Sequence, residues 1–300
     1  MRKVGIIGLG HVGVTVAYTL ITKGIVDELV CIDTDEKKAK AEFYDFSDAL
    51  AILPNQPHII MNSYEALADA DIIITAFGDI RLSVEGNDRF GELSLNAKNA
   101  KEVGQKLKAI QFDGILLNIS NPCDVICALL QHYTGLPKER VLGTGTSLDT
   151  ARMKRALAQH YNVASNNISG YVLGKHGDSQ FIAWSTVQVN HLPFSISEAE
   201  TKELEEKTRN GAWTIVEGKG YTSYGIASCA VEIVNAIFND AHQLLVVSTP
   251  FNEEETYIGY PAIIGAKGIV DTIELPLSQK EKEELAKTAQ MIQEKIDHSL

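Results

Sequence analysis

The sequence predicts an α/β fold in which a doubly wound parallel sheet is followed by an α+β domain. Three observations support this prediction. In the first half of the chain, short apolar runs alternate with stretches of helical periodicity. The first apolar run ends in a glycine-rich turn, Gly-Leu-Gly-His-Val-Gly, at residues 8–13. In the second half, long helical stretches stand beside separate groups of strand-like segments, which is typical of α+β domains.

The first half is expected to form one doubly wound unit, a Rossmann domain, over residues 1–146. Apolar runs at residues 4–8 and 29–33 flank a helical stretch at residues 11–24, and this strand–helix–strand order requires a parallel pair. The later runs are continuously apolar, as expected for strands buried on both faces. Further strands are expected at residues 71–77, 114–120 and 141–145, and further helices at residues 36–51, 90–110 and 123–134.

The second half, residues 147–300, is expected to form the α+β substrate domain. Strand-like segments occur near residues 168–173, 180–190, 243–248 and 258–271. Helical stretches cover residues 147–161, 197–217, 222–242 and 277–297. No Pro/Gly-rich linker separates the halves, so we expect them to pack together with a cleft between them.

Composition excludes several classes of partner. The 300 residues carry a formal net charge of −12, which repels nucleic acid and anionic membranes. No apolar run approaches the roughly 18 residues of a membrane span. The N-terminus shows no signal-peptide pattern, so a cytoplasmic location is expected. The scattered cysteines suggest reduced thiols without zinc-binding spacing, and no metal site is expected; they are Cys31, Cys123, Cys127 and Cys229.

The glycine-rich turn is the signature of a dinucleotide site, because it follows a strand, opens a helix and precedes an acidic residue. Gly8 permits the tight turn, Gly10 lets a pyrophosphate approach the backbone, and Gly13 allows close packing of helix and strand. Asp33 can accept hydrogen bonds from ribose hydroxyls and would repel a 2′-phosphate, which favours NAD over NADP. His11, inside the motif, is interpreted as a helix-start residue without a further role.

Five further motifs resemble the L-lactate/L-malate dehydrogenase family, in order and over essentially the whole chain. Within the family, the sequence looks most similar to bacterial L-lactate and L-2-hydroxyisocaproate dehydrogenases. The resemblance implies a small 2-keto or 2-hydroxy acid substrate and a homo-oligomer, a tetramer or a dimer. The motifs are GNDRFGEL (86–93), ISNPCDV (119–125), GTGTSLDTARMKRAL (143–157), GYVLGKHGDSQF (170–181) and GKGYTSYGIA (218–227).

Reduction of a 2-keto acid needs a proton donor, a carboxylate anchor and a group that polarises the carbonyl. His176 is the candidate acid/base, because imidazole titrates near neutrality. Asp149 is the candidate to hold its ring, and Arg152, on the same helix face, offers a planar fork for the substrate carboxylate. Arg89 would polarise the keto oxygen. Taken singly, these residues could instead be a structural histidine, a helix-surface ion pair and a solvated loop cation.

The resemblance implies further site residues. Asn121, before Pro122 in a cis peptide bond, could hold the carbonyl and the nicotinamide side. Thr222 and Ile226 match positions beside the substrate and the nicotinamide, respectively. In the family, the arginine that matches Arg89 lies on a mobile loop that closes over the substrate, and residues 79–88 correspond to that loop here.

The sequence departs from the family pattern in this loop, which is longer than the common form. The specificity position therefore aligns with either Arg81 or Ser83, and an arginine there would read the second carboxylate of oxaloacetate. Malate dehydrogenase is thus an alternative to the L-2-hydroxy-acid dehydrogenase that we favour, and a longer loop would also suit branched 2-keto acids. Lys175, beside His176, stands where the family usually has an acidic or amide residue; the two side chains are expected to diverge.

A hypothesis of another class is a non-catalytic NAD(H)-binding sensor on the same fold, because a fold alone does not determine function. The intact set of His176, Asp149, Arg152 and Arg89 argues against it. A binding protein has no need of a proton donor beside a carbonyl-polarising group.

Overall fold

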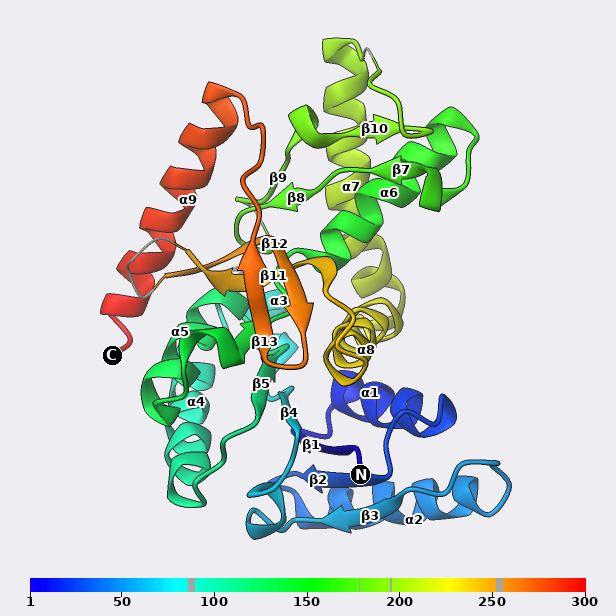
Figure 1. Ribbon diagram of the computed structural model, residues 1–300, viewed down its shortest axis with the longest axis vertical. Helices are drawn as coiled ribbons and strands as arrows, with labels where there is room; N and C mark the ends of the chain where they lie inside the picture. Colours follow the sequence, from blue (N-terminus) through cyan, green and yellow to red (C-terminus); the bar gives the residue numbers. More distant parts are fainter. Residues whose placement is uncertain (86–89, 178, 195, 252–255) are drawn as a thin grey trace.

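A nine-stranded sheet runs through the part of the chain that the computed structural model describes, residues 1–85, 90–177, 179–194, 196–251 and 256–300 (Figure 1). Its strand order is β13-β12-β11-β6-β5-β4-β1-β2-β3. The strands are β1 (Lys3–Ile7), β2 (Glu28–Ile32), β3 (His58–Met61), β4 (Ile72–Thr75), β5 (Ile115–Asn118), β6 (Val141–Gly143), β11 (Gln243–Pro250), β12 (Tyr257–Gly265) and β13 (Gly268–Thr272).

The first six strands are parallel, as the alternation of strands and helices predicts. The chain starts inside the sheet at β1 and builds outward first through β2 and β3. It then returns to the other side of β1 and continues through β4, β5 and β6. The order therefore reverses between β1 and β4, which is the place where open α/β sheets bind ligands. The prediction of a doubly wound Rossmann domain is confirmed.

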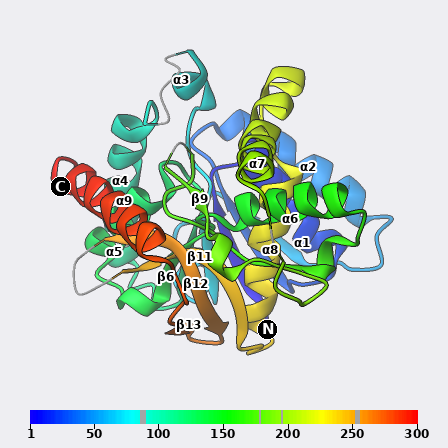
Figure 2. The ribbon, with the colours of Figure 1, turned by 90° about the horizontal axis from the view of Figure 1, so that it is seen from above.

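Helices cover both faces of the sheet. One face packs against α1, α2 and α8, and the other packs against α4, α5 and α9, each through its own apolar core (Figure 1). The helices are α1 (His11–Thr22), α2 (Glu36–Leu50), α3 (Ile80–Glu85), α4 (Leu93–Ala109), α5 (Cys123–Thr134), α6 (Ser147–Tyr161), α7 (Glu198–Lys219), α8 (Tyr224–Phe238) and α9 (Gln279–Asp297). Viewed from above, α3 projects from the body of the molecule (Figure 2).

The second half of the chain extends the first half's sheet instead of forming a large sheet of its own. β11 pairs antiparallel with β6, where Ser248 lies opposite Gly143, and β12 and β13 follow as antiparallel neighbours. A third apolar core holds α6 and α7 against two short ribbons. These ribbons pair β7 (Ile168–Ser169) with β10 (Gln188–Val189) and β8 (Val172–Leu173) with β9 (Phe181–Ile182).

The observed elements differ from the expected ones in several places. The strand β3 was not predicted, because its four residues carry too little periodicity to stand out. The single strand expected at residues 258–271 is the hairpin of β12 and β13, which turns at Gly268 with φ +92°. The strand expected at residues 180–190 is interrupted by a 3₁₀ turn at Trp184–Thr186.

The structure shows three further features that bear on function. In the described ranges, every helix is too short or too polar to cross a membrane. All four cysteines are buried and none forms a disulfide. The same ranges contain no group of three His, Cys, Asp or Glu side chains that could hold a metal ion.

Candidate active site

The glycine-rich turn leaves the carboxyl end of β1 and opens α1. Gly8 has φ +103°, and a Cβ there would lie 2.7 Å from the backbone of Ala76. A Cβ on Gly13 would lie 1.9 Å from the carbonyl oxygen of Gly8, so helix and strand pack too closely for any other residue. A Cβ on Gly10 would meet nothing within 4 Å. The fold itself therefore requires Gly8 and Gly13, whereas the space at Gly10 is open toward solvent and able to receive a ligand.

Asp33 follows β2 and faces this turn. Its Oδ2 accepts a hydrogen bond of 2.8 Å from the Leu9 N–H, and its Oδ1 accepts one of 2.9 Å from the Asp35 N–H. The carboxylate is thus fixed at the edge of a cavity of about 620 Å³ that also includes Gly10 and Asn62. A cavity at the carboxyl ends of β1, β2 and β4, with an open glycine turn and a fixed acid, fits the phosphates and ribose of a dinucleotide.

His176 and Asp149 meet from different elements. Asp149 lies in the first turn of α6, and His176 follows β8. The Nδ1 of His176 is 2.6 Å from Oδ2 of Asp149. The other carboxylate oxygen, Oδ1, accepts a hydrogen bond of 3.0 Å from the guanidinium of Arg152. One carboxylate therefore orients both the imidazole and the guanidinium.

Hydrogen bonds between backbone and side chains fix this geometry. The Thr146 hydroxyl donates to the Val172 carbonyl at 2.6 Å, and the Val172 N–H donates to the Thr150 hydroxyl at 3.0 Å, so β8 is tied to α6. Gly174 exchanges backbone hydrogen bonds of 3.1 and 3.0 Å with Gly259 of β12. The segment that carries His176 is therefore held by α6 and by β12, independently of the contact between the His176 side chain and Asp149.

Burial sets the electrostatics of the pair. Asp149 and Arg152 are 1% and 6% exposed, whereas the His176 side chain retains 25% exposure and can reach a substrate. Burial alone would raise the pKa of Asp149, but His176 and Arg152 oppose it and hold this pKa below its usual value. Asp149 is therefore a carboxylate at neutral pH and stabilises positive charge on the imidazole.

The other residues expected at the site lie on separate elements. Asn121 follows β5 before a cis peptide bond to Pro122, and its carbonyl accepts a hydrogen bond of 2.7 Å from the buried Asn96 side chain. Thr222 lies between α7 and α8, and Ile226, on α8, packs against the core that includes α1. Arg89 lies outside the described residues.

The structure also brings together residues that were given no role. The ring of His11 stacks on the ring of Tyr221 at 3.6 Å with an interplanar angle of 2°. This contact joins the glycine turn to the loop that carries Thr222. Asp124 is fully buried on α5, and its pKa is raised to about 6 by burial, against the opposing effects of Ser248, Lys175 and His176. The sequence marks Lys175 as a departure from the family pattern, whereas His11, Tyr221 and Asp124 lie inside quoted motifs without a role of their own.

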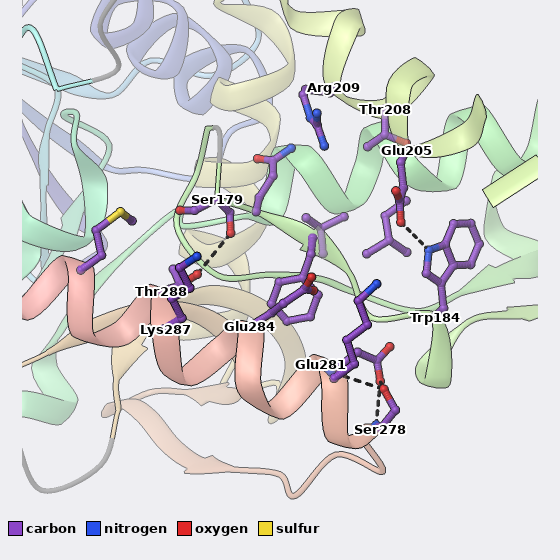
Figure 3. Close-up of a pocket in the computed structure, with 16 residues that line it drawn as sticks. Ser179, Trp184, Glu205, Thr208, Arg209, Ser278, Glu281, Glu284, Lys287 and Thr288 are labelled. Carbon is purple, nitrogen blue, oxygen red and sulfur yellow. Dashed lines mark hydrogen bonds between the residues drawn. The ribbon is translucent and has the colours of Figure 1, made fainter. Parts of the chain in front are cut away.

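A second cavity, of about 660 Å³, lies between α7, α9 and the β8–β9 ribbon (Figure 3). Its walls include Glu205, which accepts a hydrogen bond from the Trp184 indole, and Ser179, whose carbonyl accepts one from Thr288. None of the proposed site residues lines it. The glycine-turn cavity, although slightly smaller, is therefore the one that contains sequence-predicted residues.

Comparisons with known proteins agree with this arrangement. Residues 2–143 match the lactate/malate dehydrogenase NAD-binding domain, and residues 146–300 match the lactate/malate dehydrogenase α/β C-terminal domain. L-lactate dehydrogenase 1 from Bifidobacterium longum is 36% identical over 306 residues, which cover 98% of this chain and 96% of that protein. L-lactate dehydrogenase from Macrococcus caseolyticus is 36% identical over 302 residues, which cover 97% of this chain and 95% of that protein.

Solved structures of lactate dehydrogenases are also similar to this chain. A minor L-lactate dehydrogenase from Enterococcus mundtii superposes with a TM-score of 0.93 at 33% identity, covering 99% of this chain and 98% of that one. A lactate dehydrogenase from a deep-sea metagenome library of the Medee basin gives 0.92 at 35% identity, covering 100% and 99%. The chain therefore belongs to the lactate/malate dehydrogenase family and is an NAD-dependent oxidoreductase, with an NAD-binding domain followed by an α/β C-terminal domain.

Proposed function

We propose that this enzyme is an L-2-hydroxy-acid dehydrogenase of the L-lactate or L-2-hydroxyisocaproate type, with His176 as its acid/base. The observation that carries the proposal is the buried Asp149 carboxylate, which holds the imidazole at 2.6 Å and the Arg152 guanidinium at 3.0 Å. A proton donor beside a fixed cation is the pair of groups that reduction of a keto acid requires. An NAD-binding sensor without catalysis would need neither.

In the proposed reaction, His176 supplies the proton. Its Nδ1 faces Asp149, which leaves Nε2 as the nitrogen that can donate to the keto oxygen. When bound, NADH supplies the hydride that adds to the keto carbon. The alkoxide oxygen that forms takes the Nε2 proton, and the buried carboxylate stabilises the imidazolium from which that proton comes. In the reverse direction, neutral His176 accepts the hydroxyl proton.

Arg152 is proposed to hold the substrate carboxylate. A guanidinium has five N–H donors, and the contact with Asp149 leaves others for a bidentate contact with a carboxylate. Because Arg152 and His176 are both fixed by Asp149, the substrate carboxylate and keto oxygen would bind in a fixed relative position. That position would expose one face of the keto carbon and give the L product. Arg89 is proposed to polarise the keto oxygen, with Asn121 and Thr222 beside the substrate.

The remaining proposed residues hold the cofactor. Gly8, Gly10 and Gly13 would receive the pyrophosphate at the start of α1, Asp33 would bind the adenosine ribose, and Ile226 would contact the nicotinamide. The open space at Gly10 and the fixed carboxylate of Asp33 support this assignment.

The charge balance of the loop favours a substrate with one carboxylate. Arg81 forms a bidentate ion pair with Asp79, with its Nε at 2.8 Å from Oδ1 and a terminal nitrogen at 2.6 Å from Oδ2. The arginine lowers the pKa of Asp79, which therefore stays ionised and offsets the arginine's charge. A second substrate carboxylate would have to compete with the Asp79 carboxylate for the charge of Arg81. Pyruvate or a branched 2-keto acid is thus favoured over oxaloacetate.

The test follows NADH absorbance with pyruvate, 2-ketoisocaproate and oxaloacetate in turn. We expect a monocarboxylic keto acid to be reduced fastest, and His176→Gln to abolish reduction while NADH binding, followed by fluorescence, is retained. His160→Gln is the matched control, because His160 also faces a carboxylate, Glu200 at 3.4 Å, away from the site. Preference for oxaloacetate would support the malate alternative with Arg81. NADH binding without reduction of any keto acid would support the sensor.

We also propose that the enzyme is a homo-oligomer, a tetramer or a dimer. The support is its family and the exposure of large side chains along α2 and just beyond its end, where Tyr44 and Ile52 are 58% and 89% exposed. Sedimentation equilibrium should give a mass of two or four times 32.8 kDa. A single-chain mass would reject the proposal.

A further inference from the structure

Lys175 is a buried lysine that directly precedes the proposed acid/base. It is 3% exposed, and an ammonium removed from water is costly unless other groups stabilise it. Gly174, the residue before it, is held to Gly259 of β12 by two backbone hydrogen bonds. The backbone at Lys175 is therefore fixed, and the groups that face its side chain must account for the buried charge.

The first such group is the ring of Phe90. The Lys175 Nζ lies 3.9 Å from the ring centroid, which is within the range of a strong cation–π contact. The ammonium of Lys295, on α9, lies 5.0 Å from the centroid of the same ring. The side chain of Lys175 is thus directed at Phe90, while His176 is directed at Asp149, so the two neighbours diverge as expected.

Phe90 lies where the loop after β4 joins the body of the protein. Its carbonyl accepts a hydrogen bond of 2.8 Å from the Leu93 N–H at the start of α4. The next residue, Gly91, packs so closely on α3 that a Cβ would lie 2.3 Å from the carbonyl oxygen of Leu82. Phe90 directly follows Arg89, the proposed carbonyl-polarising residue, in the chain.

The second group is Asp124. It is fully buried, and its Oδ1 accepts a hydrogen bond of 2.6 Å from Ser248. Its Oδ2 has no hydrogen-bond partner within the described part of the chain. The charge of Lys175 opposes the effect of burial on this carboxyl and so helps to keep it ionised. The ring of Phe90 and the carboxylate of Asp124 together stabilise the buried ammonium of Lys175.

We propose that Lys175 is a positioning residue that couples Phe90, just before α4, to the segment of the acid/base. The inference rests on the proposed function. Through its side chain Lys175 holds Phe90, and through its backbone it holds His176. Phe90, the chain neighbour of the proposed carbonyl-polarising Arg89, and the proposed proton donor thereby share one anchor. Without the ammonium, the His176 segment keeps its ties to Asp149 and Gly259, whereas Phe90 loses its cation–π contact with that segment.

The experiment compares four variants with the wild-type enzyme: Lys175→Met, Lys175→Arg, Phe90→Leu and the double variant Lys175→Met/Phe90→Leu. We expect Lys175→Met and Phe90→Leu each to lower kcat/KM for the keto acid by about tenfold, because small misplacements of catalytic groups have large effects on rate. The double variant should lose no more than the worse single variant. Lys175→Arg, which keeps a cation over the ring, should recover most of the activity. NADH affinity should change less than twofold in all four.

Lys295→Met is the matched control, because it removes the other ammonium from the same ring without touching the His176 segment. It should keep at least half of the wild-type kcat/KM. Equal losses in Lys295→Met and Lys175→Met, additive losses in the double variant, or no recovery with arginine would each overturn the proposal. So would a Lys175→Met enzyme whose pH profile shifts while its maximal rate is unchanged. Failure of the wild-type enzyme to reduce any keto acid would instead reject the proposed function.

Discussion

The substitution Asp149→Asn tests the core of the proposed mechanism. Asparagine keeps the size of the side chain and removes the charge that faces His176 at 2.6 Å and Arg152 at 3.0 Å. A hydrogen bond to a charged group contributes about 1.5–3 kcal/mol. The imidazolium is the state that donates the proton, and each 1.4 kcal/mol, roughly, changes a rate tenfold. Loss of the contact with His176 alone should therefore lower kcat for keto acid reduction by about 10- to 100-fold.

The assay measures kcat and KM at pH 6 to 9 with the keto acid that the wild-type enzyme prefers. The loss should persist across this range, because the pKa of Asp149 lies below its usual value and the wild-type side chain is a carboxylate throughout it. NADH affinity should be unchanged. Glu281→Gln is the control: Glu281 is a carboxylate on α9 that is only 7% exposed and bonds to Ser278 and Ser185, far along the chain from the acid/base. A kcat for Asp149→Asn within threefold of wild type would refute the role of the charge.

Three further predictions follow from other contacts. Burial raises the pKa of Asp124 from 3.8 to about 6. Between these two pH values the folded protein keeps a proton on Asp124 that the unfolded chain loses, so the free energy of unfolding falls as pH rises through this range. Urea unfolding should therefore show that Asp124→Asn stabilises the fold by up to about 3 kcal/mol at pH 7 and has little effect at pH 4. Equal stability of the variant and the wild-type protein at pH 7 would contradict this prediction. His11→Ala should weaken NADH or keto acid binding about two- to tenfold, because it removes the stacking contact with Tyr221. His11→Phe should restore binding, and titration and steady-state kinetics measure both effects. Gly13→Ala should fail to fold stably, whereas Gly10→Ala should keep its melting temperature and lose NADH affinity. A normal melting temperature of Gly13→Ala or a normal NADH affinity of Gly10→Ala would refute the roles given to these two glycines.

Most of the sheet was predictable because its strands are buried on both faces and stand out as continuous apolar runs. The run at residues 114–120, for example, contains β5 (Ile115–Asn118), whose residues are all buried. Two features of the fold could not be read from local pattern. β3 is four residues long, and its first residue, His58, is exposed. The pairing of Ser248 with Gly143 joins segments more than a hundred residues apart, and no periodicity in either segment specifies this partner.

The sequence allows the residues of the candidate site to be named, but it does not predict the contacts between them. Motif resemblance pointed to Asp149 and His176, but the spacing of 27 residues between them does not predict a hydrogen bond. That bond depends on the two threonine contacts of Val172, which bring β8 against α6. His11 was interpreted as a helix-start residue because its stacking partner, Tyr221, is more than two hundred positions away.

The continuous sheet explains how two halves of the chain can build one site. The proposed cofactor cavity lies at the carboxyl ends of β1, β2 and β4, and the segment of the proposed acid/base is tied to β12 through Gly174. Both belong to the same nine strands, because β11 pairs with β6. A rigid rotation of one half against the other would have to break this pairing and the packing of α8 on α1 in the shared core. The distance between the proposed hydride and proton sources is thus a property of the sheet, and only the segments at its edge remain to adapt to different keto acids.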